Sequence, residues 1–386
     1  MKIWLVGRAY PNSNNNYNGS FEFDQAKMLS KMGHDVSYFC VETVPFYKKK
    51  GKKGTHIFQD GAITIFENYF PYQPLPPGIM VKLRDTTLLR MMKACAAEKA
   101  LPDIIHVHYP ALMGARFVCH YKKQGVRVFA TEHWTKVLSD RLNLIYKRTL
   151  ILYRQHADGL IAVGKPLKDR IDSLTGEDKS NCPTYVIPNI VPVSFQYADA
   201  PSVQPFRFIA IGRLVPCKRF NLLIQAFEKV FRTAENVELT IVGGGPEYDA
   251  LIKLIEDKGL SGKVFLIGSR PHDDIHALIH NAHVLVCSSN LETFGVPVIE
   301  AMACGRPVIT TDAIGFTDLM DDSVGIVIKT DSLEELSAAL KDIYRCYQKY
   351  DGLAISEYAL SKFSEDAVYA ELMRIYGDHQ SQDNIV

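Results

Sequence analysis

Short apolar runs alternate with longer helix-like segments along most of this 386-residue chain, and this alternation restricts the fold more than any other feature. Runs of about four to eight apolar residues suit the strands of a parallel sheet that is buried on both faces. Segment 23–33, between the first two runs, has helical spacing and ends at a glycine. The first series of expected strands is 2–7, 36–41, 104–108, 126–131, 159–163 and 184–187.

A second series of the same kind follows a break in the pattern. Segment 189–205 is rich in Pro, Ser, Ala and Gln without periodicity, and this composition is typical of a linker. The expected strands beyond it are 206–212, 238–243, 263–267, 283–288, 307–310 and 325–328. The expected helices are 221–233, 247–258, 274–281, 298–303 and 332–347, with a final amphipathic helix over 364–376.

The chain length also favours two domains, because single cores rarely grow to this size. We expect an α/β fold of two Rossmann-like, doubly wound domains that face each other across a cleft. Residues 1–195 form the first domain, residues 196–360 form the second, and residues 361–386 return to the first as a helix. In such sheets, ligands bind beyond the carboxyl ends of the strands.

Composition excludes several classes of protein. A hydrophobic content of 47% and a charged content of 23% describe a globular protein rather than a disordered one. Eight cysteines occur without a C-x-x-C pair, which favours buried thiols in the cytosol. The sequence has neither the apolar core of a signal peptide nor an apolar stretch of about 18 residues, so a cytoplasmic location is expected.

The net charge of +1 conceals an asymmetry between the two halves. Residues 1–190 carry 27 Lys and Arg against 16 Asp and Glu, and the remainder carries 17 against 27. The basic half could attract an anionic membrane surface or an acidic acceptor. A solvated loop explains its densest cluster equally well; this cluster is Lys48, Lys49, Lys50, Lys52 and Lys53.

The most informative stretch, residues 290–309, reads NLETFGVPVIEAMACGRPVI. Glu292 follows an expected strand and Glu300 lies on the next helix, so both carboxylates can face one cleft. An ionised carboxylate accepts hydrogen bonds from paired hydroxyls, such as those of sugars and ribose. A lone glutamate at a helix start is often only a capping charge, but that interpretation leaves the rest of the run unexplained.

This stretch resembles the E-x7-E signature of glycosyltransferase family 4. The resemblance implies a GT-B fold, with Glu292 holding hydroxyls of the transferred sugar and Glu300 those of the nucleotide ribose. Phe294, Gly295 and Val296 open a helix whose free backbone N–H groups suit the donor diphosphate. The first domain would then bind the acceptor and the second the nucleotide sugar.

A second match lies at residues 211–227, where the family carries Gly-Arg-Leu followed by a lysine. Gly212, Arg213 and Lys218 occupy these positions. The two cations are expected to neutralise the leaving nucleoside diphosphate. Alone, the basic pair could also be a solvated surface pair, but the downstream Glu292 and Glu300 make this the minor interpretation. Turn 268–271 matches the place where the family holds the nucleotide base, and this match makes Arg270 a candidate for donor binding. The glycine turn at 243–245 matches a loop that lines the donor site in the family, but a plain tight turn explains it as well.

The resemblance in the first domain covers shorter pieces. His133 follows an expected strand and matches the family's histidine that bonds to the donor sugar, although a structural histidine remains an alternative. His106 and His108 flank a strand and are interpreted as structural. Gly19 stands where the family often has two glycines near the diphosphate and the acceptor.

The expected reaction needs no metal and no cofactor, since neither a D-x-D pair nor zinc-ligand spacing occurs. Arg213, Lys218 and the helix dipole would stabilise the departing diphosphate, with His133 and Glu292 at the reacting sugar. The family implies a nucleotide-sugar donor and retention of configuration, through front-face displacement. A UDP-sugar is favoured, although no single residue selects the base.

The acceptor is expected to be a lipid-linked glycan or a precursor of cell-surface polysaccharide. Its choice would lie with the variable stretch 43–90 and with the apolar-basic segment 79–93. That segment could dock on a membrane interface, at the inner face of the membrane, or form an ordinary core helix. Nucleic-acid binding is not expected. Two alternatives stay open: a nucleotide-sugar epimerase of GT-B fold and a catalytically silent partner protein.

Overall fold

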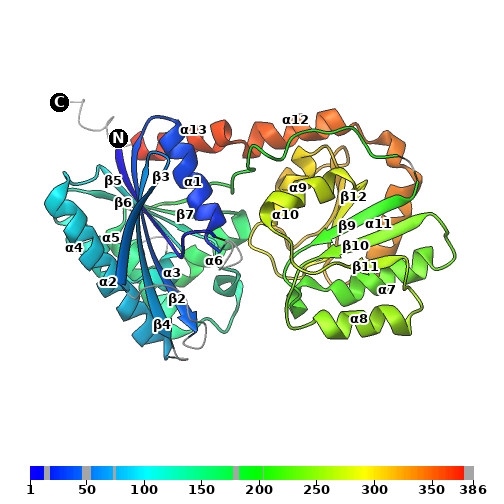
Figure 1. The fold of residues 1–386 in the computed structure, drawn as a ribbon, viewed down its shortest axis with the longest axis horizontal. Coiled ribbons are helices and arrows are strands. Elements are labelled where there is room, and N and C mark those ends of the chain that lie inside the picture. Colours follow the sequence, from blue (N-terminus) through cyan, green and yellow to red (C-terminus); the bar gives the residue numbers. More distant parts are fainter. Residues whose placement is uncertain (13–17, 46–53, 73–74, 177–181, 203, 378–386) are drawn as a thin grey trace. The chain divides into compact units, whose positions relative to one another are not determined.

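The computed structural model describes residues 1–12, 18–45, 54–72, 75–176, 182–202 and 204–377. The chain divides into two compact units, each built on its own sheet (Figure 1). Unit 1 contains Met1–Ile190 and the chain from Val368 onward, and unit 2 contains Val191–Ala367. The basic cluster at 48–53 lies outside the described residues.

Unit 1 contains an 8-stranded sheet in the order β3-β4-β2-β1-β5-β6-β7-β8. Every neighbouring pair is parallel except β3 with β4, which form an antiparallel hairpin that the sequence did not predict. The strands are β1 Lys2–Gly7, β2 Asp35–Pro45, β3 Gly54–Asp60, β4 Ile63–Tyr72, β5 Ile104–His108, β6 Arg127–Glu132, β7 Gly159–Ala162 and β8 Thr184–Val186.

Helices that are far apart in the sequence cover the unit 1 sheet. Side chains of the first and last helices share one hydrophobic cluster with the central strands, and Tyr376 of the last helix is 1% exposed. The C-terminal helix is therefore part of the unit 1 core. The helices are α1 Ser20–Lys31, α2 Pro77–Glu98, α3 Pro110–Met113, α4 Arg116–Lys122, α5 Leu144–His156, α6 Lys165–Thr175 and α13 Glu365–Gly377.

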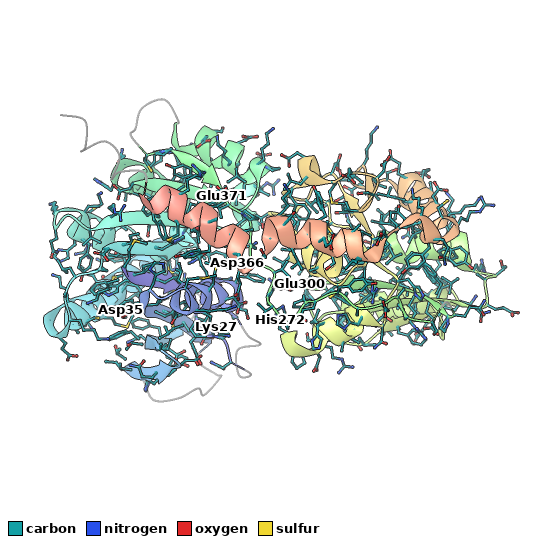
Figure 2. All side chains as sticks on the ribbon, turned by 90° about the horizontal axis from the view of Figure 1, so that it is seen from above. Lys27, Asp35, His272, Glu300, Asp366 and Glu371 are labelled. Carbon is teal, nitrogen blue, oxygen red and sulfur yellow. The ribbon has the colours of Figure 1, made fainter. Side chains whose placement is uncertain are left out.

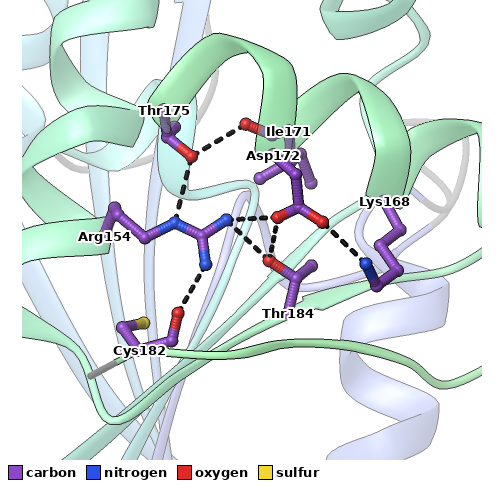
Figure 3. Close-up of polar contacts among 7 residues, drawn as sticks. All are labelled: Arg154, Lys168, Ile171, Asp172, Thr175, Cys182 and Thr184. Atoms are coloured by element: carbon purple, nitrogen blue, oxygen red, sulfur yellow. Dashed lines mark hydrogen bonds and ion pairs between the residues drawn. The ribbon is translucent and has the colours of Figure 1, made fainter. Parts of the chain in front are cut away.

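A buried polar network fixes the β8 edge of unit 1 (Figure 3). Arg154 on α5 pairs with Asp172 on α6 at 2.5 Å and donates to the Thr184 hydroxyl of β8 at 2.6 Å. Its other nitrogens donate to Thr175 and to the Cys182 carbonyl. Because a buried charge is costly unless it is paired and hydrogen-bonded, this network requires α5, α6 and β8 to keep their relative positions.

Unit 2 contains a 6-stranded, wholly parallel sheet in the order β11-β10-β9-β12-β13-β14. This is the doubly wound order in which the chain changes direction across the sheet between β9 and β12. The strands are β9 Phe206–Ile211, β10 Val237–Val242, β11 Val264–Leu266, β12 Val284–Cys287, β13 Val308–Thr311 and β14 Gly325–Ile328.

Helices cover both faces of the unit 2 sheet (Figure 1). One face carries α7 Phe220–Phe231, α8 Tyr248–Asp257 and α11 Leu333–Arg345, whose apolar side chains share one core cluster. The other carries α9 His272–His280, α10 Val296–Ala303 and α12 Gly352–Phe363, the last of which the sequence did not predict. Short 3₁₀ turns occur at Thr135–Leu138, Pro216–Lys218, Thr317–Leu319 and Tyr347–Lys349.

The expectation of buried thiols holds for only half of the cysteines. Cys40, Cys95, Cys182 and Cys304 are buried, three others are partly exposed, and Cys346 is exposed. Cys346 ends α11, where the chain turns into a surface 3₁₀ turn. Within the described ranges, no helix combines the length and the apolar character that crossing a membrane requires.

Candidate functional site

Two loops of unit 2 meet at the point where the strand order reverses. One loop follows β9 and carries residues 212–219, and the other follows β12 and carries residues 288–295. The backbone N–H of Asn290 donates to the Cys217 carbonyl at 2.9 Å, and the Ser288 hydroxyl donates to the Lys218 carbonyl at 2.9 Å. In a doubly wound sheet, this edge is where ligands bind.

Lys218 and Glu292 form an ion pair at this edge. Their side chains are 20% and 12% exposed, and Glu292 also accepts the Thr293 N–H at 3.2 Å. Burial has the largest single effect and would lower the pKa of Lys218, but the charge and hydrogen bond of Glu292, together with the nearby Cys287 and Cys217, raise it overall. Lys218 therefore keeps its positive charge, and the two predicted residues come together.

Glu300 lies one turn into α10 and is 2% exposed. A hydrogen bond of 2.8 Å joins its Oε1 to Nε2 of His272, at the start of α9, and Figure 2 labels both side chains. Burial raises the pKa of Glu300, against the opposing effect of His272. The sequence did not single out His272, because nothing in its local pattern shows that α9 and α10 meet there.

The start of α10 supplies backbone donors. Gly295 has a φ of 99°, which favours glycine, and it caps the helix. The N–H groups of Gly295 and Val296 donate to no acceptor in the described part of the chain. The Phe294 side chain is 2% exposed and packs on Phe316 and Phe363, at ring distances of 4.9 and 5.8 Å. The ring of Phe294 is therefore part of the core, and only the backbone of this residue can reach a donor.

Glycines let the loops beyond β9 and β10 approach each other. A Cβ on Gly243, whose φ is 153°, would lie 1.8 Å from the Gly212 carbonyl oxygen. Close packing of the two loops is therefore sufficient to explain why the turn has a glycine at position 243. The side chains of Arg213 and Arg270 are exposed and form no ion pair with any residue that the structure describes. The structure therefore does not bring these two arginines into the Lys218–Glu292 pair.

Unit 1 has its own reversal of strand order, between β1 and β5. Arg8 directly follows β1, and its Nε donates to Oε1 of Glu22 on α1 at 2.8 Å. Glu22 is fully buried. Tyr109 directly follows β5. The Arg8 guanidinium lies over the Tyr109 ring, 3.7 Å from its centroid. No sequence pattern singles out Arg8, Glu22 or Tyr109, because single residues at strand ends carry no motif.

His133 belongs to the same edge of unit 1 and is 9% exposed. Its Nε2 lies 2.8 Å from Nδ1 of His108, and its ring stacks 4.9 Å from Tyr109. Burial lowers the pKa of His133 to about 4, although the charge of Glu22 opposes this shift. The ring is therefore neutral near pH 7 and can offer one nitrogen as a hydrogen-bond donor or acceptor.

Two other predicted positions in unit 1 have local explanations. His106 is fully buried and bonds to Tyr376 and to the Thr131 hydroxyl, which agrees with a structural role. Gly19 caps α1 with a φ of 95°, and a Cβ there would lie 2.2 Å from the Ala9 carbonyl oxygen. Close packing at this turn is thus sufficient to require Gly19. Among the described residues, no group of three His, Cys, Asp or Glu side chains is arranged to hold a metal ion.

Two family models together match most of the chain. The model described as Glycosyltransferase Family 4 matches residues 23–195, and the one described as Glycosyl transferases group 1 matches residues 198–359. The chain is 24% identical over 321 residues to a phosphatidylinositol N-acetylglucosaminyltransferase component of Arabidopsis thaliana, covering 82% of this chain and 69% of that protein.

Solved structures share the fold over almost the full length. Sucrose-phosphate synthase from Thermosynechococcus elongatus superposes with a TM-score of 0.78 at 18% identity, covering 99% of this chain and all of the other. Anabaena HepE in complex with UDP gives a TM-score of 0.70 at 19% identity, covering 98% of this chain and all of the other. Both similarities extend over the two units.

Proposed function

Because the chain belongs to glycosyltransferase family 4 and has the GT-B fold, we propose that it transfers a sugar from a nucleotide-sugar donor to a lipid-linked or glycan acceptor. It is a glycosyltransferase. The donor that we propose is a UDP-sugar, with retention of configuration, in the synthesis of cell-surface polysaccharide. The observation that carries the proposal is the joint position of Lys218, Glu292 and Glu300 at the strand reversal of unit 2.

Each of these residues has a chemical role in the proposal. Lys218 neutralises the departing diphosphate, since it remains charged in its partly buried position. The N–H groups of Gly295 and Val296 at the start of α10 add donors for the same phosphates. Glu292 binds hydroxyls of the sugar, and Glu300, held by His272, binds those of the ribose.

The exposed Arg213 and Arg270 enter this proposal as mobile donors that meet the nucleotide only when it binds. Guanidinium groups pair readily with phosphate oxygens, and both side chains are free of ion pairs with the described residues. The reaction would be a front-face displacement in which a donor phosphate oxygen helps to deprotonate the acceptor. UDP is favoured as the leaving group because HepE, a protein of the same fold, binds it.

The proposed acceptor is an amphiphile, and the α2–α5 surface supports this choice. One face of α2 is buried through Leu88 and Met92, as in a core helix, while Ile79 and Leu83 are 47% and 37% exposed. Leu144, at the start of α5, is 68% exposed. One face of α2 therefore packs in the core, and the start of the helix exposes apolar side chains that are available for a membrane surface. The Arabidopsis relative is named for a phosphatidylinositol substrate, and we propose peripheral membrane binding through these side chains.

Thermal unfolding with a panel of nucleoside diphosphates tests the donor proposal first. Selective binding at a hundredfold excess over Kd stabilises the folded state by about 2.7 kcal/mol. We expect UDP to raise the Tm of the wild type, and we expect Glu300→Ala, Arg213→Ala and Lys218→Met to lose this shift. Lys229→Met is the matched control, because Lys229 is exposed on α7, away from the strand reversal. No shift with any nucleotide in the wild type would refute the proposal.

Two further measurements test the reaction and the acceptor. An epimerase would convert the nucleotide sugar without an acceptor, so strict dependence of sugar release on added acceptor excludes it. Flotation with anionic liposomes tests the surface: Ile79→Ser with Leu83→Ser should reduce binding, whereas exposed Leu353→Ser on α12 should not. If the wild type fails to bind liposomes, membrane association is wrong.

A further inference from the structure

The Arg8 guanidinium in unit 1 is held on two sides but keeps its outer end open. Nε donates to Glu22 at 2.8 Å, and the plane rests 3.7 Å from the Tyr109 ring centroid. The two terminal nitrogens, Nη1 and Nη2, donate to nothing within the described ranges. The side chain is only 27% exposed, so this unused end belongs to a largely buried, fixed group.

A purely structural role accounts for only part of this arrangement. Glu22 is fully buried and needs a cation, which Arg8 supplies through a single nitrogen. The remaining four N–H bonds of the guanidinium form a planar fork. This fork matches two oxygens of a phosphate or a carboxylate, and preorganising it lowers the entropy lost on binding.

The position of Arg8 in the fold also indicates a ligand. It follows β1 and contacts the residue that follows β5, which are the two strands at which the order of the unit 1 sheet reverses. This is the edge at which doubly wound sheets bind ligands. His133, which is 9% exposed, stacks on the same Tyr109 ring.

We propose that the free end of Arg8, supported by Tyr109, binds the phosphate group of an acceptor in which phosphate links the glycosylated part to a lipid. This inference rests on the proposed function and adds the chemical class of the acceptor. A diphosphate already has a candidate cation in Lys218 of unit 2, so the cation of unit 1 is available for a different anion. The excess of basic residues over 1–190 attracts the same kind of substrate.

Glycerol phosphate is the probe, and glycerol is the matched neutral control. Thermal unfolding of the full chain should show stabilisation by glycerol phosphate beyond that by glycerol. In the paired variant Arg8→Gln/Glu22→Gln, which removes the cation without leaving a buried unpaired carboxylate, this stabilisation should disappear. The UDP-induced shift should persist in the same variant, and this persistence separates the inference from the donor proposal.

Arg8→Lys gives a second, independent variant if the paired change prevents folding. A lysine ammonium can still pair with Glu22, but it lacks the two terminal nitrogens that the guanidinium offers to a phosphate. The affinity for glycerol phosphate should therefore fall by about tenfold. Three results would overturn the inference: no stabilisation of the wild type, equal stabilisation of the wild type and the paired variant, or loss of glycerol phosphate binding when UDP is saturating. The last result would assign Arg8 to the donor phosphate.

Discussion

Arg219 and Asp331, 112 positions apart in the sequence, form an ion pair of 2.5 Å although both have left-handed backbones, with φ of 53° and 59°. Such conformations cost non-glycine residues about 1 kcal/mol or more each, so the surrounding contacts must maintain them. Asn290 donates to the same carboxylate at 2.9 Å. Asp331 thereby joins the loop that carries Lys218 to the loop that carries Glu292.

Replacing Asp331 with asparagine should weaken nucleotide binding without removing it. The ion pair is 36% and 47% exposed, so solvent screening limits its contribution to about 0.5–1 kcal/mol, or a two- to fivefold change in affinity. Because Asp331 positions the loops rather than touching the nucleotide, KM for the donor should rise more than kcat falls. Asp321→Asn is the control, since Asp321 is exposed and bonds to Ser323 in its own turn. Equal donor KM values in the two variants would contradict this role.

Nucleotide affinity should fall on the acid side in a way that depends on Glu300. Burial raises the pKa of this carboxyl, so it takes up a proton at a higher pH than an exposed glutamate. The protonated carboxyl can no longer accept hydrogen bonds from two hydroxyls through two ionised oxygens and binds the paired hydroxyls more weakly. Titration calorimetry between about pH 5 and 8 should show this loss in the wild type. Glu300→Gln should bind the nucleotide more weakly, and its affinity should not fall further as the pH is lowered. The exposed control Glu334→Gln should show the same loss of affinity at low pH as the wild type.

The same raised pKa of Glu300 affects folding stability with a defined sign. The folded state favours the protonated carboxyl, so this contribution to stability is fully present below the unfolded pKa and is lost as pH rises through the folded pKa. Between these two pKa values, the Tm of the wild type should therefore fall as the pH rises, and Glu300→Gln should make this fall smaller. A decline that is identical in the variant and the wild type would exclude Glu300 as its source.

Gly243→Ala should strongly destabilise unit 2 and disturb the nucleotide site. The new Cβ would meet the Gly212 backbone oxygen at 1.8 Å, and neither backbone can move without displacing the loop that leads to Lys218. We expect a loss of more than about 3 kcal/mol in urea unfolding. Gly259→Ala is the control: its φ of 65° is strained, but no atom lies within 4 Å, so about 1 kcal/mol is expected. Similar losses for both would show that backbone strain, not contact, dominates.

Arg154→Met should unfold unit 1 more readily while leaving nucleotide binding intact. It removes the cation from the network in Figure 3 and leaves Asp172, which is 7% exposed, with Lys168 as its remaining cation. Breaking a buried pair costs about 3–5 kcal/mol, and chemical denaturation should show this loss. Exposed Arg232→Met, just after α7, 71% exposed and paired with Glu228, should cost less than about 1 kcal/mol. A small effect at Arg154 would mean that water replaces the lost partner.

Local pattern was sufficient to predict much of the fold. Apolar runs of strand length located strands such as β1 and β5, and the run around Glu292 and Glu300 indicated a glycosyltransferase before any contact was known. The β3–β4 hairpin and α12 were missed, although Ile355, Ala359 and Phe363, the buried apolar residues of α12, follow a helical period. The extent of α2 exceeded the segment 79–93, since a proline start at Pro77 favours a helix that hydropathy alone does not show.

The sequence alone indicated the alternation of strands and helices, the family and the residue types proposed to bind the donor, because each depends on neighbours a few positions apart. Only the tertiary structure decided which groups meet: His272 with Glu300, Arg219 with Asp331, and Arg8 with Glu22 and Tyr109. It also decided that Phe294 packs in the core while Arg213 stays exposed. The physical reason is that burial, pKa shifts and ion pairs arise from contacts across the sheet and between loops, and no local pattern encodes their distances.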